Sequence, residues 1–281
     1  MLAAYTENVD IYEEVSRFYR RTKTEKSVVG KSLFGRNIYA LKIGAGAPVG
    51  IAQYAIHGRE FITAKLALMQ YVFGGVKGSV WLLPLTNPDG ALLCQRGIES
   101  APQAHKEKLL AINGGEDFSL WKANGRGVDL NVNFPAKWGE GVNNTRVAGR
   151  ENYIGVKPFS EKETRALKKF TEKIKPDYTI SYHTKGEEIY WCFHQSKKFA
   201  ERDIMLAKAL SKSTGYPLKK TQGSVGGYKD WCIARFKIPA FTVEVGRDTF
   251  QHPLNDGALQ DIIEKNGASL CVLSKEYGKI K

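Results

Sequence analysis

The sequence predicts a layered α/β fold built as one domain. Short apolar runs of strand length alternate with longer amphipathic stretches of helical length along the chain. No internal repeat, low-complexity segment or linker interrupts this alternation. The 281 residues are 42% hydrophobic and 25% charged, proportions that suit one ordinary globular domain. We therefore expect a single α/β domain over residues 1–281.

The expected strands are short, apolar and rich in β-branched and aromatic residues. They cover Ile38–Ile43, Ile51–Ile56, Val80–Leu85, Tyr178–Tyr182 and Ala240–Val245. The expected helices are longer and place their apolar residues on one face. They cover Val9–Arg20, Phe61–Phe73, Ser160–Lys173, Lys198–Thr214 and Leu259–Tyr277. Ser160 and Glu163 have the spacing of a capping box, so we expect reciprocal side chain–backbone hydrogen bonds where the third helix begins.

Two histidines and a glutamate occur where expected strands end. His57 and Glu60 lie three positions apart at the end of one strand, and His183 directly follows another. Open α/β sheets place their ligand sites beyond the carboxyl ends of the strands. A His-x-x-Glu pair alone is a weak signal, but a close pair plus one distant histidine is a common way to build a catalytic zinc site. We therefore expect these three residues to bind one Zn²⁺ per chain.

Glu244 stands in an apolar, β-branched strand, Phe241-Thr-Val-Glu-Val245. A carboxylate in such a setting is costly unless it is paired or functional. A salt bridge to one of the many lysines would be the structural explanation. At the end of a strand beside a metal, Glu244 would instead suit a general base that deprotonates the zinc-bound water.

Taken in order, these segments resemble the zinc metallocarboxypeptidase family through most of the chain. His57–Glu60 matches its HxxE motif, Asn87–Gly90 its conserved turn, and residues 127–135 (GVDLNVNFP) its GVDLNRNFP stretch. Ser181–His183 matches the segment of the third ligand, and Thr242–Glu244 that of the catalytic glutamate. The resemblance implies a twisted, mixed central sheet of about eight strands flanked by helices, and a zinc peptidase.

Three positions depart from that family pattern. Family members follow the asparagine of the GVDLN stretch with an arginine that binds the substrate's terminal carboxylate, but here Asn131 is followed by Val132. Asn131 still offers an amide to the substrate, whereas Val132 has no donor. Lys122 takes the place of an arginine that stabilises the oxyanion, and Arg126 is close enough to share that role. Gln222 falls near the position of a substrate-binding tyrosine.

The residues around 121–131, with a non-arginine next, are similar to the bacterial γ-D-glutamyl-L-diamino acid peptidases. That resemblance implies cleavage of peptidoglycan stem peptides, with Glu244 as general base and Lys122 or Arg126 facing the oxyanion. Arg247 is a candidate contact for a substrate carboxylate. The alternatives are an ordinary carboxypeptidase that releases C-terminal residues, a small-molecule deacylase, and a non-catalytic peptide- or cell-wall-binding module.

Composition narrows the partners. The net charge of +13, from 42 basic and 29 acidic residues, favours carboxylate-rich substrates. The basic residues are scattered and form no nucleic-acid-binding motif, so we expect no nucleic acid. No apolar run approaches the roughly 20 residues that cross a membrane. The four cysteines lack metal or redox spacing and the first residues lack a signal-peptide pattern, so we expect free thiols and a cytoplasmic protein. The oligomeric state does not follow from the sequence.

Overall fold

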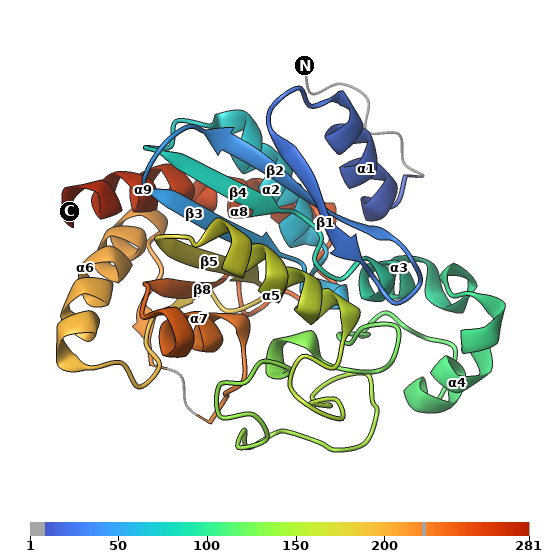
Figure 1. Cartoon of the computed structure of the whole chain (residues 1–281). Coiled ribbons are helices and arrows are strands. Elements are labelled where there is room, and N and C mark those ends of the chain that lie inside the picture. The colour runs from blue at the N-terminus through green and yellow to red at the C-terminus, as the bar shows by residue number, and fades with distance from the viewer. Residues whose placement is uncertain (1–8, 221–222, 281) are drawn as a thin grey trace.

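A computed structural model, which describes residues 9–220 and 223–280, shows a mixed sheet between two layers of helices (Figure 1). The eight strands lie in the order β1-β2-β4-β3-β5-β8-β6-β7. Their bounds are β1 Lys26–Lys31, β2 Asn37–Gly44, β3 Val49–Tyr54, β4 Ser79–Leu83, β5 Tyr178–His183, β6 Glu188–Tyr190, β7 Leu218–Lys219 and β8 Ala240–Glu244. The four central strands β4, β3, β5 and β8 run parallel, and β2 and β6 flank them in the antiparallel sense. The predicted fold class and strand number are therefore confirmed.

Helices cover both faces of the sheet (Figure 1). Their bounds are α1 Ile11–Arg21, α2 Ile62–Phe73, α3 Pro88–Arg96, α4 Gln103–Asn113, α5 Lys162–Ile174, α6 Lys197–Thr214, α7 Tyr228–Phe236, α8 Leu259–Asn266 and α9 Ser269–Ile280. Helices α2, α6, α8 and α9 pack against one face, and α5 and α7 pack against the other.

The central strands read as continuous apolar runs because both of their faces are covered. Every residue of β5 is buried. In β3, Ile51 faces the core under α5 and α7, whereas Ala52 and Tyr54 face the core under α2 and α6. This double burial fixes the register, since a slip of one residue would exchange the two faces.

The C-terminal segment differs from the prediction of one helix over Leu259–Tyr277. The structure ends α8 at Asn266 and begins α9 at Ser269. The Asn266 carbonyl accepts from Gln70 Nε2 at 2.8 Å and from Ser269 Oγ at 2.6 Å. In a continuous helix, the Asn266 carbonyl would accept from the backbone N–H four residues later. Here the two side-chain donors occupy it instead, and the helix ends at Asn266.

The predicted capping box at α5 is wrong. The helix begins at Lys162, two residues later than expected, with Glu161 at the N-cap and no side-chain cap bond. Ser160 Oγ donates to Glu161 Oε1 at 2.7 Å instead of capping the helix. Glu163 turns into the protein, where its Oε1 accepts from the Leu33 N–H at 2.9 Å. A tertiary contact therefore replaces the local one.

All four cysteines are free thiols. Burial raises the pKa of Cys94 and of Cys232 to about 12, which keeps both thiols protonated and unreactive. Among the helices of the described residues, none has both the length and the apolar character that a membrane crossing requires.

Candidate active site

The ends of three adjacent parallel strands carry the predicted metal ligands and Glu244. His57 follows β3 and opens a short 3₁₀ helix, Gly58–Glu60, which carries the second ligand. His183 and Glu244 are the last residues of β5 and β8 and are paired in register. Gly58 permits this turn because a Cβ there would lie 2.5 Å from the backbone of Gly90 and 2.7 Å from the Trp121 carbonyl.

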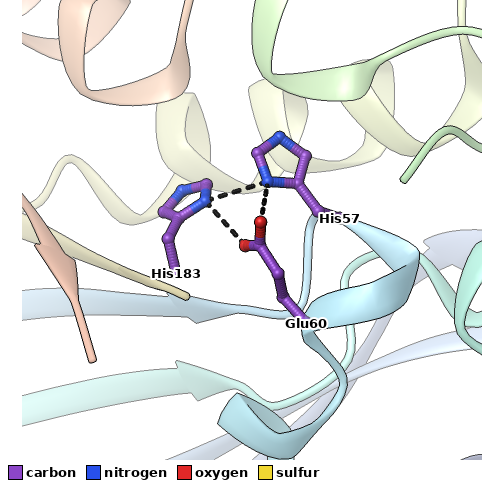
Figure 2. A group of neighbouring side chains, drawn as sticks. All are labelled: His57, Glu60 and His183. Carbon is purple, nitrogen blue, oxygen red and sulfur yellow. Dashed lines mark hydrogen bonds and ion pairs between the residues drawn. The ribbon is translucent and has the colours of Figure 1, made fainter. Parts of the chain in front are cut away.

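The three ligand side chains point toward one another (Figure 2). His57 Nδ1 lies 2.8 Å from Glu60 Oε1, and His183 Nδ1 lies 3.0 Å from Glu60 Oε2. The two Nδ1 atoms are 3.1 Å apart. Two ligand atoms bound about 2.1 Å from a tetrahedral zinc are roughly 3.4 Å apart, so the spacing is close to that of a coordination shell. Two imidazoles and one carboxylate also leave a fourth position open, and this donor set fits one zinc ion.

The charges around His57 and Glu60 shift the pKa values of both side chains in the direction that favours a positive charge at the site. Burial opposes protonation of His57, but the nearby Glu60 and Asp129 carboxylates outweigh burial and raise the pKa of His57. Burial likewise opposes ionisation of Glu60, yet the two imidazoles hold the pKa of Glu60 well below its ordinary value. Glu60 is therefore ionised at neutral pH, as a metal ligand must be.

Asp129 connects the metal site to Lys122, and sequence reasoning did not select it. Asp129 Oδ1 lies 3.2 Å from His57 Nε2, and Asp129 Oδ2 lies 2.8 Å from Lys122 Nζ. Burial opposes charge on this carboxyl, but Lys122 and His57 hold its pKa well below the usual range. A carboxylate on the outer nitrogen of a ligating histidine fixes the ring and its tautomer. The sequence signals were an acid between two apolar residues, Val128 and Leu130, and its place in the GVDLN stretch.

Lys122 lies beside the metal ligands. Its carbonyl accepts from the Gly58 N–H at 2.9 Å, which ties its segment to the ligand turn. Burial opposes its charge, but Asp129 and then Glu60 outweigh burial and raise the pKa of Lys122. Lys122 therefore remains a cation in a cavity of about 210 Å³ that His57, His183 and Glu244 also line.

Glu244 has the environment of a base rather than of a structural salt bridge. No ion pair joins it to a lysine or arginine among the described residues. Burial raises its pKa to about 7, and Glu60 and Glu188 add to that effect against the opposing charges of His183 and Lys122. A carboxyl that titrates near neutral pH can both take up and release a proton.

The predicted substrate residues divide into two groups. Asn131 and Val132 line the cavity of about 210 Å³ beside the metal ligands. Arg126 and Arg247 do not line this cavity: Arg126 Nε lies 3.4 Å from Glu161 Oε2, and Arg247 Nη2 lies 2.7 Å from Asp261 Oδ1. Each guanidinium is paired with a carboxylate outside the cavity. The geometry therefore favours Lys122 over Arg126 as the cation that would face the oxyanion. Gln222 lies outside the described residues.

A larger cavity, of about 410 Å³, adjoins the first and was not predicted. The two share Asn131, Ser224 and Glu244. Most of its lining residues come from β6, β7 and β8 and from the start of α7. Tyr228 is fully buried at the start of α7 and bonds to the Thr171 hydroxyl at 2.8 Å, so it is a packing residue.

Comparison with known proteins adds independent information. The sequence pattern described as zinc carboxypeptidase matches residues 76–266, which include His183 and Glu244. The chain is 32% identical over 248 residues to γ-D-glutamyl-L-diamino acid endopeptidase 1 of Lysinibacillus sphaericus. The matched region covers 81% of this chain and 62% of that relative. The chain thus spans about three fifths of that protein's length.

Two further similarities cover different shares of the chain. Murein peptide amidase A of Escherichia coli K12 is 37% identical over 134 residues, which are 44% of the chain and 50% of that protein. A chain in the structure of bovine thrombin-activatable fibrinolysis inhibitor with tick carboxypeptidase inhibitor superimposes with a TM-score of 0.73. That likeness covers 96% of this chain and 95% of the other at 19% identity, and it therefore shows a shared fold.

Proposed function

The chain belongs to the zinc carboxypeptidase family, and we propose that it hydrolyses the γ-D-glutamyl–diamino acid bond of peptidoglycan stem peptides. One observation carries the hydrolytic part of the proposal. The two histidine ligands, Glu244 and Lys122 line a single cavity, so a base and a fixed cation lie beside a zinc site. When bound, zinc polarises a carbonyl and lowers the pKa of a water toward roughly 7.

The chain's own residues supply the proton transfers and the positive charge. Glu244 accepts a proton from the attacking water and delivers it to the leaving amine, a role that its pKa of about 7 favours. Lys122 faces the oxyanion that develops on the scissile carbonyl. A preorganised donor at this place is typically worth about 3–4 kcal/mol. Asp129 holds Lys122 and His57 in position.

Val132 supports a substrate other than a simple C-terminal peptide. This buried side chain lines the cavity but offers no donor to a terminal carboxylate. One relative is named as an endopeptidase for γ-D-glutamyl-L-diamino acid bonds and another as a murein peptide amidase, and both names support a stem-peptide substrate. The net charge of +13 suits stem peptides, which carry several carboxylates.

The test is a substrate panel read by mass spectrometry. Zinc-loaded protein is incubated with γ-D-glutamyl stem peptides and with hippuryl-type carboxypeptidase substrates, and the released fragments are identified. We expect cleavage between the γ-D-glutamyl group and the diamino acid. Faster cleavage of the hippuryl substrates would instead indicate an ordinary carboxypeptidase.

Val132→Arg tests the substrate class within the same panel. A restored charged hydrogen bond contributes roughly 1.5–3 kcal/mol, so the ratio of stem to hippuryl cleavage should fall by about one to two decades. Val72→Arg is the matched control because Val72 is 70% exposed at the end of α2. An unchanged ratio in Val132→Arg would mean that another residue binds the terminal carboxylate.

A further inference from the structure

Helix α5 carries a stripe of exposed basic side chains. Its members are Lys162, Arg165, Lys169 and Lys173, which follow one another at spacings of three, four and four residues. Residues at such spacings lie on one face of a helix. At a rise of about 1.5 Å per residue, the stripe is roughly 17 Å long. The buried side of α5 packs against the sheet, so this α5 basic stripe faces away from it.

The four cations of the stripe have no acidic partners. Among residues 9–220 and 223–280, none of the four forms an ion pair with a carboxylate. The acids of this segment are engaged elsewhere, since Glu161 and Glu163 are buried and Glu172 lies 2.8 Å from Lys168. Three lysines in the opposite layer of helices, in contrast, each lie within 3.0 Å of a carboxylate: Lys65, Lys265 and Lys279. The positive charge of the stripe is therefore not offset at its own surface.

The stripe begins close to the catalytic cavity. Lys162 is the first residue of α5, and the N-cap residue Glu161 accepts from Asn124 Nδ2 at 2.9 Å. Asn124 comes two residues after Lys122, which lines the cavity. From this end, α5 runs across the face of the sheet (Figure 1). A long ligand with one part in the cavity therefore has the stripe within reach.

The stripe offers charge without apolar or aromatic contacts. Every aliphatic and aromatic side chain of α5 is at least partly buried. A helix that binds a membrane inserts its apolar face, but the apolar face of α5 packs against the sheet. Single-stranded nucleic acid is held by aromatic stacking as well as by charge. The stripe therefore fits an anionic polymer that is bound through its charges alone.

We propose that the α5 basic stripe binds carboxylates of intact peptidoglycan, on stem peptides that neighbour the one in the catalytic cavity. The inference rests on the proposed function, because the polymer that carries the cleaved stem then supplies these anions. Contacts to several stems of one polymer reinforce one another. An exposed ion pair is worth about two- to threefold in affinity, so four pairs together should be worth about 10- to 100-fold. Intact peptidoglycan lies outside the cytoplasm, so the proposal departs from the cytoplasmic location expected from the sequence.

The first experiment removes the stripe and measures binding. The stripe variant combines Lys162→Gln, Arg165→Gln, Lys169→Gln and Lys173→Gln. The matched control loses the same charge from exposed positions of α6, through Lys197→Gln, Lys198→Gln, Lys208→Gln and Lys212→Gln. Both sets are made in Glu244→Gln, which leaves the polymer uncut, and are sedimented with insoluble peptidoglycan freed of phosphate polymers. The Kd should rise about 10- to 100-fold in the stripe variant and less than about threefold in the control.

Two further arms identify the bound groups. Affinity should fall at least about tenfold between about 50 and 300 mM NaCl, because salt screens exposed charges. Amidation of the peptidoglycan carboxyl groups with a carbodiimide and a neutral amine should weaken binding as much as removal of the stripe. Binding that survives amidation would overturn the proposal. Equally tight binding to DNA or to anionic lipid vesicles would also overturn it, since the stripe would then attract any polyanion.

Cleavage separates this inference from the proposed function. With Glu244 present, the stripe variant should cleave a soluble γ-D-glutamyl stem tripeptide within about twofold of wild type. Its kcat/KM on intact peptidoglycan should fall by about 10- to 100-fold. If wild type does not cleave the soluble stem, the proposed function fails, while the sedimentation assay still decides whether the stripe binds the polymer. Equal losses on both substrates, or equal weakening in the α6 control, would overturn the role of the stripe.

Discussion

Replacing Asp129 with asparagine should weaken zinc binding although none of the three metal ligands is substituted. The Asp129 carboxylate is fully buried and faces four donors. Oδ1 lies 3.2 Å from His57 Nε2 and accepts from the Asn131 N–H at 3.0 Å. Oδ2 lies 2.8 Å from Lys122 Nζ and accepts from the Asn152 N–H at 3.3 Å. An asparagine side chain has one oxygen, so in either orientation its NH₂ group faces two donors.

The expected magnitude follows from this arrangement. The oxygen should stay with the ammonium of Lys122, because an unpaired charge costs more than an unpaired neutral donor. His57 Nε2 then loses its acceptor, and the tautomer that leaves Nδ1 free for the metal is no longer favoured. Loss of such a partner typically lowers metal affinity about 10- to 100-fold. Two unsatisfied buried donors should also cost the zinc-free protein about 2–4 kcal/mol of unfolding free energy.

Zinc affinity is measured by competition with a zinc-specific fluorescent chelator. The stability of the zinc-free protein is measured separately by calorimetric unfolding. A loss of about 3 kcal/mol should lower the Tm by roughly 6–10 °C for a chain of this size. Asp256→Asn is the control, since the Asp256 side chain is 70% exposed. Zinc affinity within twofold of wild type in Asp129→Asn would refute the proposed support of His57.

Other predictions concern the ligands, the base and one buried acid. His57→Ala and His183→Ala should each abolish stoichiometric zinc on elemental analysis, and retention of one zinc per chain would contradict the ligand set. Glu244→Gln should keep the zinc but lower kcat by about 10²–10⁴; activity within tenfold of wild type would exclude a general base. Burial, and then the nearby Asp89 carboxylate, raise the pKa of Glu163 from 4.5 to about 7. The native state therefore binds this proton more tightly than the unfolded chain, and stability is lost as the pH rises between these values. In urea titrations, Glu163→Gln should gain up to about 3 kcal/mol relative to wild type between pH 4.5 and pH 8. A constant difference across that range would contradict the raised pKa.

The sequence was most informative for metal-binding and acidic residues that lie at the ends of strands. His57, His183 and Glu244 could be placed together because each follows an apolar run, and parallel strands end at one edge of a sheet. Glu60 then followed from its three-residue spacing to His57. The buried central strands were also clear, since double burial produces unbroken apolar segments.

Long side chains and short edge strands were the features that sequence could not place. Arg126 and Arg247 were candidates by position, but the direction of a guanidinium depends on which carboxylate folds beside it. Strand β7 has two residues and β6 has three, too few to show an alternating pattern. No sequence pattern singled out Lys229, which lines the larger cavity, because that cavity is formed by α7 together with strands that are distant in sequence.

The position of β8 in the sheet has a consequence for folding during synthesis. This strand lies between β5 and β6 in space, yet it is the last of the eight along the chain. During synthesis, β6 and β7 therefore have no place to join the sheet until residues 240–244 leave the ribosome. The same five residues bring Glu244, the proposed base, so the strand that completes the sheet and this carboxylate emerge together. On the proposed mechanism, a nascent chain that has not emerged through Glu244 can hold its metal ligands but lacks the group that takes the proton, so it cannot hydrolyse peptides.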